Sequence, residues 1–423
     1  MTKRMLLAVL LLIVFALPAG CQKQGGEPTQ PTAPAPTILP TPTPDPVGEA
    51  LAGMTVEQKA AQLLVAGIEG TEPGEDAVQA VQGYQVGGVI LFGRNVESAE
   101  QLAALTNGLR ELNGDYTPLF LCVDQEGGRV DRMPPEASRT PSAWSVGQTL
   151  DTEGVGVSYG ELLAAECAAF GFNMDFAPSL DIWSNPDNTV IGDRAFGNDW
   201  EWTAFFGMSA VEGMEKQGTV IPVVKHFPGH GDTAVDSHTA LPVVDKTLED
   251  LWQSELVPFD MVLSGQFWGE PVMEPTPAVM VAHILLSQID PDNPASLSPG
   301  VVTGLLREEM GYEGVVCTDD LTMGAISNTY GMGEAAVLAV EAGCDLLLVC
   351  HGADNLAAAH AALVEAVDSG RIPEERLDES VRRILALKGA YGLTNAPVEA
   401  PDIEALNDRI AALERSIEAD TSQ

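Results

Sequence analysis

The sequence has 423 residues, of which 45% are hydrophobic, and it carries 61 acidic and 21 basic residues for a formal net charge of −40 at pH 7. A chain of this length and composition can bury a large core, which excludes an intrinsically disordered protein. The negative charge repels phosphate backbones, so nucleic acid is excluded as an expected partner.

The N-terminus predicts an export signal. Lys3 and Arg4 precede an apolar run over residues 5–17, which is short for a bilayer-spanning helix. Small residues directly before Cys21 resemble the cleavage box of bacterial lipoproteins, although Pro18 stands where that box usually has leucine. We therefore expect residues 1–20 to be a lipoprotein-like signal peptide and Cys21 to be the lipidation site. Ordinary secretion and an uncleaved anchor are the alternatives.

The rest of the chain divides by composition into three parts. Residues 21–46 are rich in proline and threonine, which predicts an extended linker. Residues 47–395 hold the periodic apolar segments of a single large domain, and residues 396–423 predict one C-terminal helix or tail. The five cysteines after Cys21 lie mostly within apolar runs and lack Cys-x-x-Cys spacing, so buried free thiols are expected instead of disulfides or a zinc site.

Eight apolar, β-branched runs in the large domain predict β-strands. They begin at Leu63, Gly87, Pro118, Asn173, Val220, Ala278, Gly314 and Cys344. Helical stretches alternate with them, at residues 98–113, 154–171, 199–218, 298–311, 331–343 and 355–370, and several begin and end on capping residues. This alternation predicts an α/β fold, a (β/α)8 TIM-type barrel with one domain. An open doubly wound sheet is the alternative, but residues 66–76 make a poor glycine-rich phosphate turn.

Polar residues stand at the ends of several predicted strands. In a barrel, these ends build the active site. The candidates are Asp124, Asp181, Lys225, His226, His283, Asp319, Asp320 and His351. Any one of them could be a buried hydrogen-bonded residue, and for His283 and His351 that interpretation is as good as a functional one. Acids, bases and cations on one rim together predict a catalytic or binding site.

Four motifs at these strand ends carry a family resemblance. They are DQEGGRV at residues 124–130, IGDRAFG at 191–197, KHFPGHGDT followed by DSH within 225–238, and TDDLTM at 318–323. In this order they resemble glycoside hydrolase family 3, in its bacterial β-N-acetylhexosaminidase branch. The resemblance extends from about Met54 to Leu393. It implies a metal-free barrel enzyme that retains configuration through a covalent glycosyl intermediate.

The resemblance assigns the catalytic residues. Asp319, the first aspartate of TDDL, matches the nucleophile. Strand alternation would place Asp319 on one face with Cys317 and put Asp320 on the other, as a structural hydrogen-bonding partner. His238 matches the acid/base, and Asp236 matches the aspartate that orients it. Imidazole suits this work because it titrates near neutral pH, and the glycines and proline of the motif predict a pliable loop.

The same resemblance implies a set of sugar-binding residues. It consists of Asp124, Arg132, Arg194, Lys225 and His226. Aspartate and arginine suit this role because they make paired, directional hydrogen bonds to neighbouring hydroxyls. Structural roles are expected for the remaining polar residues of the motifs, which are Glu126, Arg129, His230 and Asp232.

The expected substrate is a glycan with terminal β-linked N-acetylglucosamine, either a cell-wall (peptidoglycan) fragment or a chito-oligosaccharide. We expect no cofactor, a monomer, and an extracellular protein that touches the membrane only through its lipid anchor. A β-N-acetylglucosaminide phosphorylase of the same family is one alternative, because a histidine acid/base repels phosphate less than a carboxylate would. A lipid-anchored sugar-binding protein is another. A metal-dependent hydrolase built on the motif histidines is a third, although their spacing fits no rigid metal site.

Overall fold

The structure is a computed structural model of the chain, and it describes residues 45–152, 154–233, 236–237, 239–267 and 269–422. The predicted signal peptide, Cys21, most of the linker and His238 lie outside the described residues.

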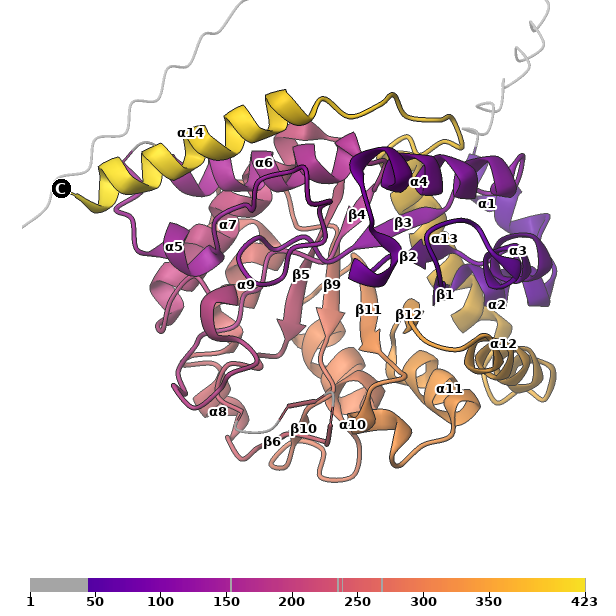
Figure 1. Cartoon of the computed structure of the whole chain (residues 1–423). Coiled ribbons are helices and arrows are strands. Elements are labelled where there is room, and N and C mark those ends of the chain that lie inside the picture. The colour runs from indigo at the N-terminus through magenta and orange to yellow at the C-terminus, as the bar shows by residue number, and fades with distance from the viewer. Residues whose placement is uncertain (1–44, 153, 234–235, 238, 268, 423) are drawn as a thin grey trace, which may run out of the picture. The chain divides into compact units, whose positions relative to one another are not determined.

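Eight strands close into a barrel (Figure 1) in the order β1-β12-β11-β9-β5-β4-β3-β2. Every neighbouring pair is parallel. The strands are β1 (Leu64–Gly67), β2 (Gly88–Ile90), β3 (Phe120–Val123), β4 (Met174–Asp175), β5 (Ile221–Phe227), β9 (Ala278–Val281), β11 (Val315–Asp320) and β12 (Leu346–Val349). Each overlaps one of the predicted runs, so the predicted (β/α)8 barrel is confirmed and an open sheet is excluded.

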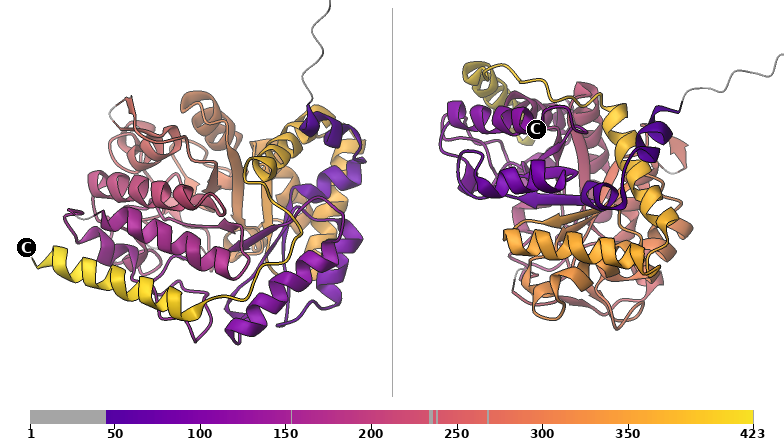
Figure 2. Two further views of the ribbon diagram at one scale, coloured as in Figure 1. Left: turned by 90° about the horizontal axis from the view of Figure 1, so that it is seen from above. Right: turned by 90° about the vertical axis from the view of Figure 1, so that its right-hand side faces the viewer.

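Helices surround the barrel and connect its strands (Figures 1 and 2). The α-helices are α1 (Pro46–Ala52), α2 (Val56–Gln62), α3 (Glu75–Val78), α4 (Ala99–Asn113), α5 (Ala143–Gly147), α6 (Val155–Ala169), α7 (Trp200–Gln217), α8 (Leu248–Leu251), α9 (Leu256–Ser264), α10 (Gly324–Ser327), α11 (Met332–Ala342), α12 (Ala353–Asp368), α13 (Glu374–Ala390) and α14 (Ile403–Thr421). Shorter or π-type helices are η1 (Gln79–Tyr84), η2 (Gly93–Asn95), η3 (Gly192–Arg194), η4 (Ala295–Leu297) and η5 (Gly300–Glu309). Two small outlying sheets pair β6 (Val243–Val244) with β10 (Leu285–Leu286) and β7 (Gln266–Phe267) with β8 (Glu270–Pro271).

The predicted caps define several helix ends. The side chain of Ser98 accepts the backbone N–H of Gln101 at the start of α4, and Asp199 caps α7 in the same way. Gly218 ends α7 with a φ of +63°, a left-handed conformation that glycine adopts without steric cost. Local signals therefore fix where these helices begin and end.

The barrel strands are almost entirely buried because helices cover them on the outside. All residues of β3, β5, β9 and β12 are buried, which explains their continuous apolar runs. The five cysteines of the described region are buried and unpaired, as predicted. Within the described residues, no helix is both long and apolar enough to cross a bilayer.

The C-terminal helix α14 lies along α6 (Figures 1 and 2). It buries Ile410 and Leu413 in an apolar cluster that also contains Tyr159 and Phe206. Helix α14 therefore packs on the outer helices of the barrel.

Candidate active site

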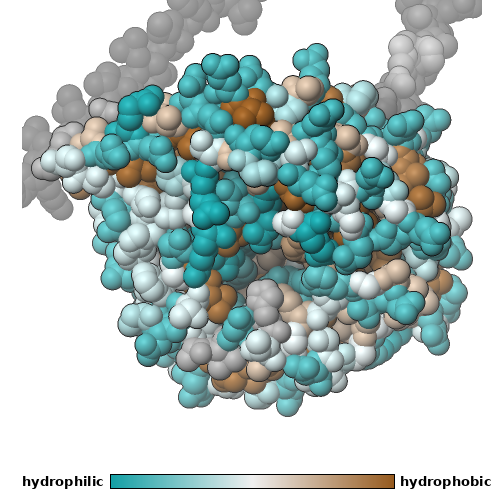
Figure 3. Space-filling model, viewed as in Figure 1, coloured by the Kyte–Doolittle hydropathy of each residue, from teal (hydrophilic) through white to brown (hydrophobic). Residues whose placement is uncertain are grey.

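A pocket of about 320 Å³ lies at the carboxyl ends of the barrel strands. It is lined by residues in or just after β2, β3, β5, β9, β11 and β12, together with the loop that follows β4. Six of the sequence-predicted site residues line it, namely Asp124, Arg132, Arg194, Lys225, His226 and Asp319. The face of the molecule seen in Figure 3 is largely hydrophilic and is hollowed near its middle. The barrel thus brings together side chains that are widely separated in the sequence.

Asp319 lies at the end of β11 and lines the pocket. Burial disfavours its ionised form, but the nearby His283, His226 and Lys225 and a hydrogen bond from the Asp320 N–H favour that form. The result is a pKa below the ordinary value for aspartate. A partly buried carboxylate that stays ionised and faces a pocket is suited to nucleophilic attack.

Asp320 also lines the pocket, although strand alternation would send it to the opposite face from Asp319. The pairing register of β11 with β12 shifts between Cys317 and Asp320, which breaks the alternation. The Asp320 carboxylate accepts hydrogen bonds from the N–H groups of Thr322 and Cys350. The prediction that Asp319 and Asp320 lie on opposite faces is therefore wrong, because both side chains line the pocket. The two hydrogen bonds agree with the structural role expected for Asp320.

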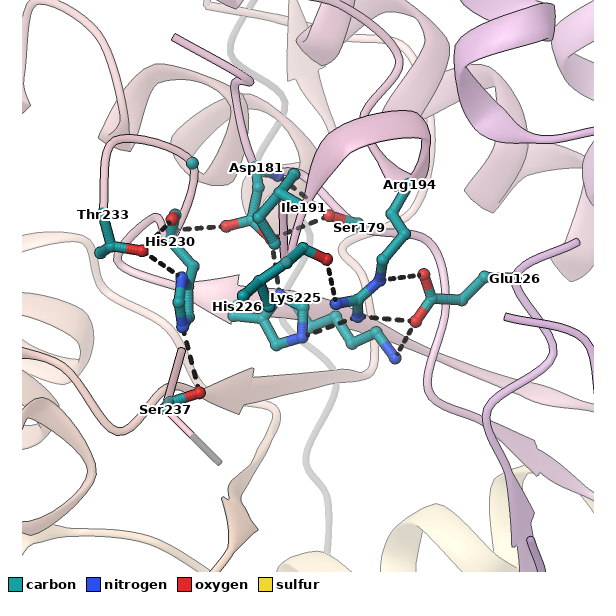
Figure 4. Close-up of polar contacts among 12 residues, drawn as sticks. Glu126, Ser179, Asp181, Ile191, Arg194, Lys225, His226, His230, Thr233 and Ser237 are labelled. Atoms are coloured by element: carbon teal, nitrogen blue, oxygen red, sulfur yellow. Dashed lines mark hydrogen bonds and ion pairs between the residues drawn. The ribbon is translucent and has the colours of Figure 1, made fainter. Parts of the chain in front are cut away.

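Two cations and two carboxylates form a compact cluster at one side of the pocket. Lys225 Nζ lies 2.6 Å from Asp124 Oδ1 and 2.5 Å from Glu126 Oε1. Arg194 donates two hydrogen bonds to the Glu126 carboxylate, at 2.7 and 2.8 Å (Figure 4). Burial opposes ionisation of Glu126, but Arg194 and Lys225 lower its pKa well below the usual range. Glu126 therefore holds two of the predicted sugar-binding residues, Arg194 and Lys225, in place. These contacts agree with the structural role expected for Glu126.

Lys225 and His226 are consecutive in β5, yet both line the pocket. Regular alternation would send them to opposite faces of the strand. The register of β5 with β9 shifts between Val224 and Phe227, across the two residues. This irregularity lets two adjacent side chains serve the same site.

His226 is held by a partner on each side of its ring. Its Nδ1 lies 2.5 Å from Asp181 Oδ2, and Arg194 Nη2 donates to its Nε2 at 3.1 Å (Figure 4). Because the guanidinium can only donate, Nε2 accepts and Nδ1 carries the proton. His226 lines the pocket as predicted, but both ring nitrogens already have protein partners in this structure.

Arg132 lines the pocket from the loop after β3. Its backbone N–H donates to the side chain of Gln125 at 2.8 Å. Its Nε is buried and has no hydrogen-bond partner among the described residues. Arg132 therefore lines the pocket, and its role in sugar binding stays a prediction.

The segment around the predicted acid/base is described in part. Asp236 and Ser237 are described, and Ser237 lines the pocket, but His238 lies outside the described residues. The carbonyl of Asp236 accepts the N–H groups of Thr239 and Ala240. The roles of His238 and Asp236 therefore remain predictions, as does lipidation of Cys21.

The expected structural roles of two other motif residues agree with their contacts. Asp232 pairs with Lys246 at 3.0 Å, and Arg129 pairs with Asp193 and donates to loop carbonyls. His283 is fully buried, with its ring against the Ser296 hydroxyl and the Asp320 carbonyl, and it does not line the pocket.

The pocket also contains residues that motif analysis did not assign. His351, named only as a strand-end candidate, has a side chain that is 55% exposed and stacks on Phe92, with ring centroids 5.8 Å apart. The guanidinium of Arg94 also lies over the Phe92 ring, with its carbon 4.6 Å from the ring centroid. Phe92 is the last residue of the run that predicts β2, and Arg94 follows two residues later, so their position at a strand end was the available signal.

The metal-site alternative finds no geometric support in the described part of the chain. Within it, no group of three or more histidine, cysteine, aspartate or glutamate side chains is arranged to hold a metal ion. The motif histidines instead bond to protein groups. His226 bonds to Asp181, and His230 bonds to Ser237.

Comparison with known proteins places this site in a family. Residues 55–387 match the family model described as glycosyl hydrolase family 3 N terminal domain. The chain is 38% identical over 293 residues to a beta-hexosaminidase of Alkalilimnicola ehrlichii, covering 68% of this chain and 80% of that relative. It is 34% identical over 333 residues to beta-hexosaminidase A of Pseudoalteromonas piscicida, covering 73% of this chain and 54% of that relative.

Solved structures agree with the sequence comparison. The structure of a glycoside hydrolase family 3 beta-N-acetylglucosaminidase from Paenibacillus sp. str. FPU-7 superposes with a TM-score of 0.79 at 42% identity, covering 85% of this chain and 68% of that chain. A beta-N-acetylhexosaminidase from Beutenbergia cavernae superposes with a TM-score of 0.71 at 30% identity, covering 80% of this chain and 99% of that chain. With its barrel, its ionised strand-end aspartate and these matches, the chain belongs to glycosyl hydrolase family 3 and is a glycosidase.

Proposed function

We propose that the protein is a retaining exo-β-N-acetylhexosaminidase that releases terminal β-linked N-acetylglucosamine from cell-wall fragments or chito-oligosaccharides. The observation that carries this proposal is the position of Asp319 at a strand end in a pocket shared with the Lys225 and Arg194 cluster. The names of the matched relatives support the acetylated amino sugar as the substrate class.

The proposed mechanism has two steps. Asp319 attacks the anomeric carbon and forms a glycosyl ester, while an acid protonates the leaving oxygen. His238 is proposed as that acid and afterwards as the base that activates water, with Asp236 orienting its ring. Asp124, Lys225, Arg194 and Arg132 hold the sugar hydroxyls, because charged groups make strong, directional hydrogen bonds.

A substrate panel tests the proposal. The protein should hydrolyse nitrophenyl N-acetyl-β-glucosaminide faster than the corresponding β-glucoside or β-xyloside, and activity should persist after exhaustive chelation. Faster cleavage of the unacetylated glycosides would show that the substrate assignment is wrong. Binding without turnover would instead favour the sugar-binding alternative.

Hydrolysis and phosphorolysis are distinguished by their products. We expect free N-acetylglucosamine with or without added phosphate, because the named relatives above 30% identity are hexosaminidases and an acetylglucosaminidase. A sugar 1-phosphate formed in phosphate buffer would favour the phosphorylase alternative.

We further propose that the protein acts outside the cell, anchored through an acylated Cys21. The support is the N-terminal sequence alone. Cys21→Ala should remove the protein from the membrane fraction and leave it in the medium or as an unprocessed precursor. Release of the unaltered protein into the medium would contradict the anchor without affecting the enzymatic assignment.

A further inference from the structure

A chain of hydrogen bonds leads from the sugar-binding cluster to the segment that carries His238. Arg194 bonds to His226, and His226 bonds to Asp181, which is completely buried (Figure 4). The second oxygen of Asp181 accepts the backbone N–H of His230 at 2.6 Å. The ring of His230 then contacts Ser237 Oγ at 3.2 Å from its Nε2. One carboxylate therefore fixes both histidines of the motif.

The proton positions in the second half of this chain follow from its partners. The Thr233 hydroxyl donates to the His230 carbonyl at 2.9 Å, so it accepts from His230 Nδ1 at 2.8 Å. Nδ1 then carries the ring proton, and Nε2 is left to accept the Ser237 hydroxyl. Burial lowers the pKa of His230, which keeps the ring neutral and preserves this acceptor. His230 is thus built to receive one hydrogen bond from Ser237.

Ser237 is also tied to the nucleophile side of the pocket. It is only 2% exposed, and its carbonyl accepts the N–H of Ala325 at 3.1 Å. Ala325 belongs to α10, which begins four residues after Asp320. Asn328, just beyond α10, donates to the carbonyl of Thr239 at 3.2 Å. Ser237 is thereby held between the His230 loop and the segment after β11, and Thr239 contacts the same segment.

We propose that His230 and Ser237 are positioning residues, which hold the described neighbours of His238 so that this acid/base is presented to the leaving oxygen. Asp181 is the common support that aligns this pair with His226, which lines the pocket. This proposal rests on the proposed role of His238. It adds a function to His230 and Ser237, for which sequence motifs predict only loop structure.

The decisive measurement compares substrates that differ in their need for an acid. Ser237→Ala should lower kcat on an N-acetylglucosamine disaccharide about 10- to 100-fold, part of the contribution of a general acid, with KM within about twofold of wild type. On the dinitrophenyl glycoside, whose leaving group departs unaided, the variant should keep near wild-type turnover when azide replaces water as the nucleophile. Ser237→Thr retains the hydroxyl and should recover most of the lost disaccharide turnover.

Substitution of the partner tests whether the two residues act as a pair. His230→Gln keeps an acceptor near the Nε2 position and should resemble Ser237→Thr, whereas His230→Leu should resemble Ser237→Ala. The double variant His230→Leu/Ser237→Ala should be no worse than the poorer single variant, because both remove the same bond. Asp181→Asn should differ from all of these by raising KM as well, since it also releases His226.

Thr106→Ala is the matched structural control, because it removes a buried hydroxyl that donates to the Phe170 carbonyl. It should alter thermal stability without a leaving-group-dependent loss. The proposal is overturned if, in azide, Ser237→Ala lowers turnover of both substrates equally or lowers neither. It is also overturned if the losses of turnover in Ser237→Ala and His230→Leu multiply in the double variant. If His238→Ala itself shows no dependence on the leaving group, the proposed acid/base assignment fails first. If it does and Ser237→Ala does not, only the positioning role fails.

Discussion

At the scale of single residues, each buried charge of the pocket is stabilised by a specific neighbour. Glu126 is nearly inaccessible yet ionised, because Arg194 and Lys225 both contact its carboxylate. Removing one member of such a set leaves an uncompensated charge, which costs more than the pair contributes. The pocket residues are therefore interdependent, and single substitutions in this cluster will alter both binding and stability.

The roles of Asp319 and His238 predict different substrate dependence. His238→Ala should lose far more activity on a disaccharide than on a nitrophenyl glycoside, because a nitrophenolate departs without protonation. It should show a burst of nitrophenol and partial recovery with azide, since the second step lacks its base. Asp319→Ala lacks the attacking group and should fail on both substrates without a burst, as measured by stopped-flow absorbance. Equal losses without a burst in His238→Ala would mean that the acid lies elsewhere.

Glu166, a buried acid outside the pocket, should make the stability of the folded protein depend on pH. Burial raises the pKa of Glu166 to about 8, although hydrogen bonds from Thr140 and Gln125 favour its ionised form. Between its ordinary value of 4.5 and about 8, the folded protein holds a proton that the unfolded chain releases. Stability from this group therefore falls as pH rises through that window.

Glu166→Gln cannot titrate, so its unfolding free energy relative to wild type should increase from pH 5 to pH 8, by at most about 1.4 kcal/mol per pH unit. Urea unfolding at each pH measures this difference. The exposed Glu365→Gln is the control and should show a flat difference. A flat profile for Glu166→Gln would show that the carboxyl is ionised in the fold.

At the scale of elements, register irregularities decide which side chains enter the pocket. The shifts in β5 and β11 bring consecutive polar residues, Lys225 with His226 and Asp319 with Asp320, to the same opening.

A network of buried polar side chains joins helices to a barrel strand. Asp345, just before β12, bonds to Ser380 of α13 and pairs with three arginines, of which Arg307 lies at 2.6 Å.

Asp345→Ala should lower the unfolding free energy by about 3 kcal/mol, because it leaves partly buried arginines and a buried strand N–H without their acceptor. Glu334→Ala removes an exposed pair with Arg371 and should change stability by less than about 1 kcal/mol. Denaturant titration of both variants measures the contrast. A small loss in Asp345→Ala, similar to that of Glu334→Ala, would mean that solvent replaces the network.

At the scale of the whole molecule, the net charge of −40 opposes compaction. The melting temperature should therefore rise by several degrees as sodium chloride increases from about 20 mM to about 0.5 M, because the screening length shortens to a few ångströms. Potassium chloride should act equally if screening is the cause. A fall in melting temperature with salt would show that attractive ion pairs outweigh the repulsion.

The sequence by itself determined the elements and the chemistry of the main residues. Eight apolar runs separated by capped helices predict the barrel, because strand and helix periodicity are local properties of the chain. The TDDL and KHFPGHG motifs also place Asp319, Lys225 and His226 at strand ends, where a barrel has its site. These residues line the pocket as expected.

Only the tertiary structure decided which side chains are partners. Asp181 lies 45 positions before His226 and 49 before His230, and the contacts exist because β4 and β5 are neighbours in the closed barrel. The stacking of Phe92 on His351 likewise joins the ends of β2 and β12, which flank β1. No local period encodes such pairs, and the register shifts that admit adjacent residues to the pocket arise from strand pairing. Side-chain partnership is thus a property of packing between distant segments, whereas the strands themselves are a property of each segment.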